Sequence, residues 1–391
     1  MRRGVRLGPS DRERAARLLL ELIRIDSHSR REGAMAARLA RECEALGVQA
    51  EVDDAGARVG GETGNLLVRV PGTRPGAPPL LLSAHMDTVV PGEGIVPVVD
   101  GHVVRTDGRT ILGADDKAGC VIVLETIRLL REHRRPHGDL EVVFTVCEEV
   151  GLLGARAFDC TRLAARSGLV FDSEGVGLAY TRQPACDHLH FTVEGLEAHA
   201  GVAPERGISA IRIAAEAVAA MRLGRVDEAT TANVGWIEGG GPVNVVPHRA
   251  RLHAEARSLD EAALDAQCRH MRECIESAAA RHATVLDGRR VEARVTTAIE
   301  RQYPAMNVSP DAPIFRRVRD AAARLGQPLA AASSCGSSDA NVFNARGIAC
   351  VDLGTGMQRI HTLAEWIDLR GLWSATELAV EIAGLPREGA A

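Results

Sequence analysis

The 391-residue sequence contains a single lysine, Lys117, and every other basic side chain apart from histidine is arginine. Aromatic residues make up only 3% of the chain, so aromatic side chains give no indication of a preferred ligand. No stretch approaches the ~20 apolar residues of a membrane-spanning helix. The net charge is −5 and no basic block occurs, so we expect neither nucleic acid nor a membrane surface as a partner.

The nine cysteines include no C-x-x-C pair. In a chain of this length, such scattered cysteines are typical of free thiols in a reducing compartment rather than of a disulfide framework. The N-terminal sequence MRRGVRLGPSDRER lacks the apolar stretch of a secretory signal. We therefore expect a cytoplasmic protein.

The pattern of apolar residues changes twice along the chain. Near-continuous apolar runs alternate with helical segments up to residue 184 and again from 303 to 391. This pattern predicts an α/β domain with a mostly parallel sheet covered by helices. Residues 185–302 instead read strand-helix-strand-strand-helix-strand with alternating strands, which predicts an inserted α+β ferredoxin-like sandwich domain.

Helix boundaries are predicted from capping signals. Residues 10–26 and 29–46 have helical patterns, and each is predicted to begin with a capping box. These boxes pair Ser10 with Glu13 and Ser29 with Glu32. A long buried helix is predicted to begin at Asp116.

Acidic and histidine residues recur where the predicted strands of the α/β domain end. Ligands of open α/β sheets bind beyond the carboxyl ends of the strands. Many carboxylates at one place repel each other unless they bind cations, and mixed histidine and carboxylate ligands suit zinc, with cobalt or manganese possible. We therefore predict a site for two divalent cations. The residues in question are His85, Asp87, Asp115, Asp116, Glu148, Glu149, Asp172 and His361.

Several motifs in a fixed order carry a resemblance to a known family: SAHMD, GADDKAG, CEEVGLLGA, FDSEG, EAHAG, GGGPVNVVPHRARLHAEARS, GSSDAN and HTLAEW. From about residue 10 to 380 the sequence resembles the dinuclear zinc metallopeptidases that include peptidase T, aminoacylase and succinyl-diaminopimelate desuccinylase. It is most similar to peptidase T-like proteins, especially through GLEAHAGVAPERGISAI. The resemblance implies a zinc exopeptidase-like catalytic domain, formed by 1–184 and 303–391, with an inserted lid and dimerisation domain.

The resemblance also implies a set of metal ligands. Asp115 would bridge two Zn²⁺ ions, His85 and Asp172 would complete one site, and Glu149 and His361 would complete the other. Asp116 is the alternative bridge within GADD. The family places its bridging aspartate two residues before the lysine, which favours Asp115 and makes Asp116 a carboxylate that interacts with a helix dipole.

Three further roles concern the surroundings of these ligands. Asp87, two residues after His85, would orient that imidazole. By the resemblance, Glu148 is the general base that takes a proton from water and passes it to the leaving amine. Lys117 is interpreted as an ion-pair partner of the acidic cluster.

The inserted domain carries three candidate substrate contacts. By the resemblance, His199 reaches the active site of a dimer partner and stabilises the oxyanion, while Asn244 and Arg257 hold the substrate backbone and a carboxylate. In the GSSDAN loop, Ser337 replaces a usual glycine. Asp339 in that loop is either a contact for a substrate ammonium group or a turn cap.

These inferences predict a cytoplasmic, homodimeric, two-zinc exopeptidase that releases the N-terminal residue of short peptides. By the resemblance, Asp172 favours this reading, since peptidase-type members tend to have aspartate there, whereas carboxypeptidase and deacylase members tend to have glutamate. The alternative is an amidohydrolase of N-acyl amino acids or a related amide. A non-catalytic binding protein on the same fold is a more remote alternative, because such a protein is expected to lose Glu148 or a ligand and none is missing.

Overall fold

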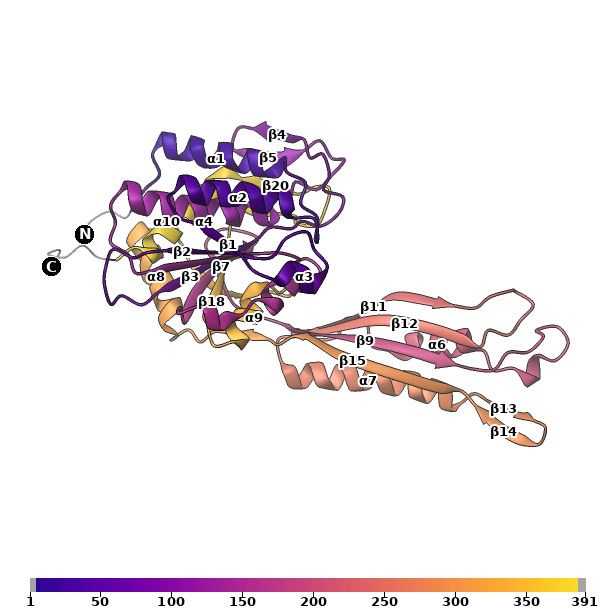
Figure 1. Cartoon of the computed structure of the whole chain (residues 1–391). Coiled ribbons are helices and arrows are strands. Elements are labelled where there is room, and N and C mark those ends of the chain that lie inside the picture. Colours follow the sequence, from indigo (N-terminus) through magenta and orange to yellow (C-terminus); the bar gives the residue numbers. More distant parts are fainter. Residues whose placement is uncertain (1–4, 386–391) are drawn as a thin grey trace. The chain divides into compact units, whose positions relative to one another are not determined.

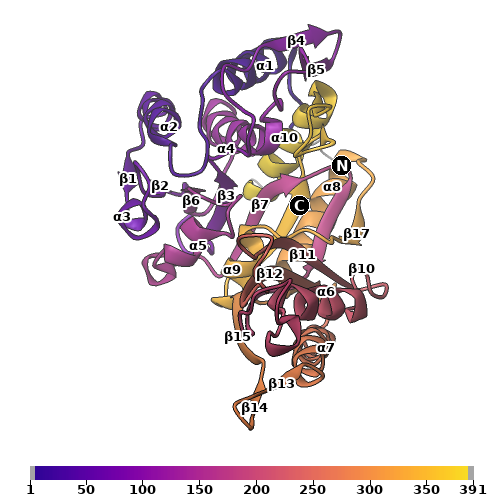
Figure 2. The same ribbon diagram turned by 90° about the vertical axis from the view of Figure 1, so that its right-hand side faces the viewer.

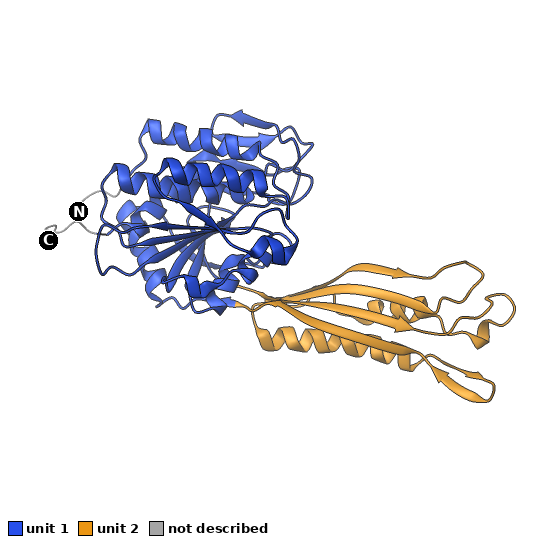
Figure 3. Cartoon of the chain, viewed as in Figure 1, with its two compact units in different colours: residues 1–182, 306–391 blue, residues 183–305 orange. Residues whose placement is uncertain are grey.

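The computed structural model describes residues 5–385, and the chain divides into two compact units (Figure 3). Unit 1 runs to Arg182 and resumes at Met306, whereas unit 2 spans Gln183–Ala305. Within the described residues, no helix combines the length and the apolar character needed to cross a membrane.

Unit 1 is built on a nine-stranded sheet with the order β1-β2-β6-β3-β7-β18-β8-β16, and β17 pairs with β8. Its central strands β6, β3, β7 and β18 are mutually parallel. Strands β3 and β6 are buried at every position, which explains their continuous apolar sequence. The bounds are β1 (Ala50–Val52), β2 (Leu66–Val70), β3 (Leu80–His85), β6 (Leu140–Thr145), β7 (Ser167–Ser173), β8 (Leu178–Gln183), β16 (Met306–Asn307), β17 (Ala330–Ser333) and β18 (Ala349–Gly354).

Helices cover both faces of this sheet, so the predicted α/β class is confirmed (Figure 1). On one face lie α1 (Pro9–Ile23), α2 (Gly33–Ala45), α4 (Ala114–Glu132) and α8 (Pro313–Leu325), and α9 (Asp339–Ala345) lies on the other. The remaining elements of unit 1 are α3 (Ala55–Val59), α5 (Leu153–Ala157), α10 (Leu369–Ala383) and a small sheet of β4 (Pro97–Asp100), β5 (Val103–Thr106), β19 (Met357–Gln358) and β20 (Trp366–Asp368).

Both predicted capping boxes are wrong. Helix α1 begins after Gly8, whose N–H donates to Asp11 Oδ2 at 2.9 Å. Helix α2 begins after Glu32, and Ser29 lies outside it. The Ser29 hydroxyl donates instead to Asp87 Oδ2 at 2.6 Å, so a tertiary contact takes the place of the local cap.

Unit 2 has the order β11-β12-β9-β15, with the short β10 beside β11, and its long strands pair antiparallel. Helices α6 and α7 lie together on one face of this sheet (Figures 1 and 2). This is the ferredoxin-like arrangement that the sequence predicts. The bounds are β9 (Ala185–Glu194), α6 (Ala210–Ala220), β10 (Gly224–Arg225), β11 (Thr230–Gly239), β12 (Arg249–Ser258), α7 (Glu261–Ala280), β15 (Arg294–Tyr303) and the hairpin β13 (Ala283–Leu286) and β14 (Arg289–Glu292).

Candidate metal centre

Three neighbouring parallel strands deliver acidic and imidazole side chains to one edge of the unit 1 sheet. His85 is the last residue of β3, Glu148 and Glu149 follow β6, and Asp172 lies near the end of β7. Asp115 comes from the start of α4. His361 follows β19. The structure thus brings together all five residues that the resemblance assigns as metal ligands.

Asp115 lies between two histidines. Its Oδ1 is 3.1 Å from His85 Nε2, and its Oδ2 is 3.1 Å from His361 Nε2. Each imidazole also faces a second carboxylate: His85 Nε2 is 3.4 Å from Asp172 Oδ1, and His361 Nε2 is 2.9 Å from Glu149 Oε2. The site therefore consists of two histidine–carboxylate pairs that share one aspartate.

The electrostatics of this cluster fit two cations. Burial raises the pKa of Glu148 well above its usual value, and the neighbouring Glu149 and Asp339 raise it further. The pKa of Asp172 is raised by burial and by Glu148. Buried like charges of this kind are stable when metal ions neutralise them. Oxygen and imidazole donors are also ligands that zinc, cobalt and manganese accept, so the residues present fit a pair of divalent ions.

Two histidines and burial have opposite effects on the pKa of Asp115. Burial alone would raise its pKa, but hydrogen bonds from His361 and His85 outweigh that effect and lower it. Hydrogen bonds with Asp115 and Glu149 raise the pKa of His361 to about 10. Asp115 is therefore the member of the cluster that is most firmly held as a carboxylate.

Asp87 differs in detail from its predicted role. His85 Nδ1 lies 3.0 Å from the backbone carbonyl oxygen of Asp87, but 3.5 Å from the carboxylate Oδ1. The carboxylate instead accepts the backbone N–H groups of Glu148 at 2.9 Å and Glu149 at 3.2 Å. The carbonyl of Asp87 thus orients the imidazole, while its side chain holds the turn that presents the two glutamates.

Asp116 points to different partners from Asp115. Its carboxylate accepts the backbone N–H of His85 at 3.1 Å and that of Gly119 at 3.0 Å. One carboxylate oxygen of Asp116, one ring nitrogen of His85 and one carboxylate oxygen of Asp172 lie within 4.8 Å of one another. Asp116 therefore ties β3 to the start of α4 through two backbone donors, a more specific contact than the predicted interaction with a helix dipole.

Glu365 is a buried residue of this region that the sequence analysis did not single out. Its carboxylate accepts four consecutive backbone N–H groups, from Leu112 at 2.7 Å, Gly113 at 2.9 Å, Ala114 at 2.8 Å and Asp115 at 3.2 Å. Burial and the nearby Asp115 raise its pKa to about 7. Its only sequence signal is its place in the HTLAEW motif. Glu365 positions the backbone that carries Asp115.

Lys117 does not pair with the acidic cluster, so that interpretation is wrong. It is fully buried, and its ammonium donates to the carbonyl oxygens of Ile25 at 2.6 Å and Ile23 at 3.5 Å. Burial lowers its pKa to about 8. The lysine therefore connects α4 to the C-terminal end of α1.

The GSSDAN loop begins α9. The hydroxyl of Ser338 caps this helix by accepting the N–H of Ala340, so Asp339 is not the cap. Asp339 Oδ2 accepts a hydrogen bond from the Thr145 hydroxyl, and its buried Oδ1 has no partner within residues 5–385. The backbone φ of Ser337 lies outside the left-handed region, so serine in place of glycine causes no strain there.

The candidate substrate contacts of unit 2 lie at different places. His199 and Asn244 are neighbours, because the N–H of Ala200 donates to the carbonyl of Asn244 at 2.9 Å and His199 forms a bridge with Val245. Arg257 lies near the other end of β12, where its Nη2 is 3.1 Å from Glu255 Oε2. Arg257 is thus engaged by a carboxylate of its own chain.

Comparisons with known proteins agree with this architecture. The model of peptidase family M20/M25/M40 matches residues 81–384. The chain is 40% identical over 364 residues to the uncharacterized protein YqjE of Bacillus subtilis (strain 168), covering 93% of this chain and 95% of that protein. It is also similar to the crystal structure of aminopeptidase PepT from Bacillus cereus ATCC 10987, with 39% identity, a TM-score of 0.85, and coverage of 95% and 98%.

A tripeptidase from Staphylococcus aureus subsp. aureus Mu50 has 34% identity and a TM-score of 0.87, with 95% of this chain and 97% of that chain covered. These relatives and the family model agree with the resemblance carried by the motifs. The chain therefore belongs to peptidase family M20/M25/M40 and is a metallopeptidase of that family, similar to peptidase T.

Proposed function

We propose that this protein is a two-metal aminopeptidase that releases the N-terminal residue of short peptides, tripeptides foremost. The observation that carries the proposal is Asp115, whose two oxygens face His85 and His361, with the buried Glu148 in the same cluster. In this proposal the metals are two Zn²⁺ per chain, with Co²⁺ or Mn²⁺ as substitutes. The similar PepT and tripeptidase structures support the substrate class.

The ligands in this proposal are Asp115 for both ions, His85 and Asp172 for one, and Glu149 and His361 for the other. When bound, the ions would polarise the scissile carbonyl and lower the pKa of a water molecule. Glu148 would take a proton from the attacking water and return it to the leaving amine. The carboxylate of Asp87 supports this step by holding the backbone N–H of Glu148 in place.

Recognition of a free N-terminus distinguishes an aminopeptidase from the alternative amidohydrolase. Asp339 provides a buried carboxylate oxygen without a partner in the described chain, and its carboxylate is close enough to Glu148 for each charge to affect the other. Burial raises the pKa of Asp339 to about 6. A substrate ammonium group would satisfy that oxygen, and the loss of a hydrogen bond to a charged group costs ~1.5–3 kcal/mol.

The test is a panel of tripeptides, dipeptides, their N-acetylated forms and N-acyl amino acids, assayed with metal-loaded enzyme. We expect free tripeptides to be cleaved from the N-terminus, with a roughly tenfold or larger fall in kcat/KM on acetylation. Glu148→Gln should keep its metal and its fold while turnover falls ~10²–10⁴-fold. Faster cleavage of acylated substrates would instead establish the amidohydrolase, and an unchanged Glu148→Gln rate would remove Glu148 from the mechanism.

We also propose a cytoplasmic homodimer formed through unit 2, in which His199 acts in the active site of the partner subunit. All nine cysteines are free thiols, which supports a reducing compartment. His199 and Asn244 lie beside the start of β12, whereas Arg257 lies near its end, roughly 25 Å away at the rise of an extended strand. A tripeptide in one pocket is too short to contact residues this far apart. If His199 and Arg257 both contact the substrate, they must therefore come from different chains.

Subunit exchange between two inactive variants, His199→Ala and Glu148→Gln, tests this arrangement. A mixed dimer would contain one site with both groups intact, so activity should return to about half that of a normal dimer if the sites are independent. Exchange verified by mass, with no activity recovered, would show that His199 serves its own chain or does not take part.

A further inference from the structure

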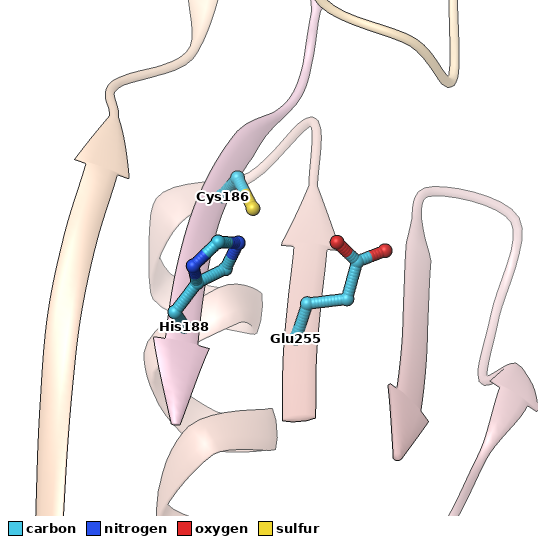
Figure 4. A group of neighbouring side chains, drawn as sticks. All are labelled: Cys186, His188 and Glu255. Atoms are coloured by element: carbon cyan, nitrogen blue, oxygen red, sulfur yellow. The ribbon is translucent and has the colours of Figure 1, made fainter. Parts of the chain in front are cut away.

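A second group of potential metal ligands lies in unit 2, apart from the carboxylate cluster of unit 1. A sulfur of Cys186, an imidazole nitrogen of His188 and a carboxylate oxygen of Glu255 all lie within 4.8 Å of one another. Figure 4 shows the thiol and the imidazole on one strand and the carboxylate on its neighbour. A cation at bonding distance from all three requires only small side-chain movements, since zinc bonds to these atom types are about 2.0–2.3 Å long.

The strand register places these side chains together. Cys186 and His188 are two residues apart on β9, so they project from the same face of the sheet. Glu255 of β12 is the direct antiparallel partner of His188, and Arg257 is the partner of Cys186. This face is opposite to the one that buries Leu189, as the alternating burial along β9 shows. The group therefore stands on paired strands rather than on a loop, which favours a defined geometry.

The imidazole and the thiol differ in how readily they bind a cation. The imidazole of His188 forms a ring contact with His190. Burial lowers its pKa, so the ring is neutral at pH 7 and has a free lone pair. Cys186 is almost fully buried, and burial raises its pKa to about 11, against the opposing effects of Arg257 and Tyr303. A cation must therefore displace the thiol proton to solvent when it binds.

Arg257 sets the expected strength of the site. Its Nη2 holds Glu255 Oε2 at 3.1 Å, and its positive charge disfavours a neighbouring cation. A thiolate and a carboxylate together carry two negative charges, which balance a divalent ion, so the guanidinium leaves a net charge of +1. The centre in unit 1 has more carboxylates and no arginine among its closest contacts. The unit 2 group should therefore fill only after the unit 1 centre.

We propose that Cys186, His188 and Glu255 form a third metal site, which binds one Zn²⁺ or Co²⁺ with water in the remaining position. Thiolate and imidazole donors select zinc-like ions over magnesium or calcium. Such an ion would join β9 to β12 close to the first residues of unit 2, which begins at Gln183. The proposal does not depend on the peptidase assignment.

Cobalt substitution tests this site separately from the other two. None of the ligands proposed in unit 1 contains sulfur, so the near-ultraviolet absorption of a cobalt–thiolate bond would report a cysteine site alone. Metal-free protein is titrated with Co²⁺, and bound metal is counted after removal of excess ion. We expect the thiolate band to appear after the first two ions have bound and to stop growing when about one further Co²⁺ per chain has bound. Cys186→Ser should abolish the band, and Glu255→Gln should weaken it.

Cys274→Ser is the matched control, because Cys274 and His270 form another cysteine–histidine pair in unit 2, with Sγ 3.7 Å from Nε2. This variant should keep the full band. His188→Gln changes a half-buried position and provides a second test if Cys186→Ser does not fold. Saturation of the wild type at two bound ions per chain, with no thiolate band at any cobalt concentration, would overturn the proposal, as would a band that survives both Cys186→Ser and His188→Gln.

Discussion

Glu365→Gln is a stringent perturbation of the metal centre, because it alters no proposed ligand. The carboxylate gives each oxygen two backbone N–H donors, with Leu112 and Gly113 on Oε2 and Ala114 and Asp115 on Oε1. A glutamine side chain has one carbonyl oxygen and one NH₂ group. The NH₂ group would face two of the backbone N–H donors and leave them without an acceptor. Each unsatisfied buried donor costs about 1–3 kcal/mol, or about 2–6 kcal/mol together.

An opposing term comes from the charge of Glu365. Its pKa is raised from 4.5 to about 7, which means that the buried carboxylate costs about 3 kcal/mol at pH 8 relative to a solvated one. Glutamine removes this cost, so the change in the free energy of unfolding should amount to only a few kcal/mol. Metal affinity is the sharper measurement. Displacement of the loop that carries Asp115 should weaken metal binding about 10–100-fold, as is typical when a residue that positions a ligand is lost.

The assay combines chelator competition for metal affinity with urea unfolding of the metal-free protein. Glu141→Gln is the matched control, since Glu141 is also buried and accepts two backbone N–H groups, from Ala164 at 3.1 Å and Ala165 at 2.8 Å, which do not adjoin a proposed metal ligand. It should lose stability while keeping wild-type metal affinity. Wild-type affinity in Glu365→Gln would refute the role assigned to this carboxylate.

Two further predictions concern Asp115 and Lys117. Asp115→Ala should lose both metals together, and chelation of the wild type should abolish activity. Metal analysis of Asp115→Ala that finds one site still fully occupied would contradict a carboxylate shared by the two sites. The depressed pKa of Lys117, about 8 against 10.5, means that the unfolded chain holds its proton to higher pH. Wild-type stability should therefore rise by about 3 kcal/mol from pH 8 to 10.5 relative to Lys117→Met, as measured by urea unfolding, and parallel curves for the two proteins would contradict the burial of the charge.

The fold was predictable because its signals are periodic and repeated. Buried parallel strands require continuous apolar runs, and the open sheet of unit 2 requires alternation, so the fold class follows from the sequence pattern. The meeting of His85, Glu149 and Asp172 was also predictable, since carboxyl ends of neighbouring parallel strands share one edge. His361 and Asp115 required the motif order as well, because a loop and a helix start have no comparable periodicity.

Contacts between distant segments account for what the sequence analysis missed. Ser29 has the spacing of a cap but donates to Asp87, 58 residues away. Glu365 meets the loop before α4 across 250 residues, and no local pattern indicates that meeting. Lys117 follows two aspartates in sequence, yet the direction of its side chain from α4 takes it to the end of α1. Local spacing predicts a residue's element better than it predicts the partner of its side chain.

The burial of Lys117 has a practical consequence. Because the chain has one lysine and its ammonium is fully buried against Ile23 and Ile25, amine-acylating reagents reach no lysine side chain of the folded protein. Acylation of Lys117 then requires the contact between α1 and α4 to open. The rate at which the peptide containing Lys117 gains mass would therefore report this local opening without any engineered label.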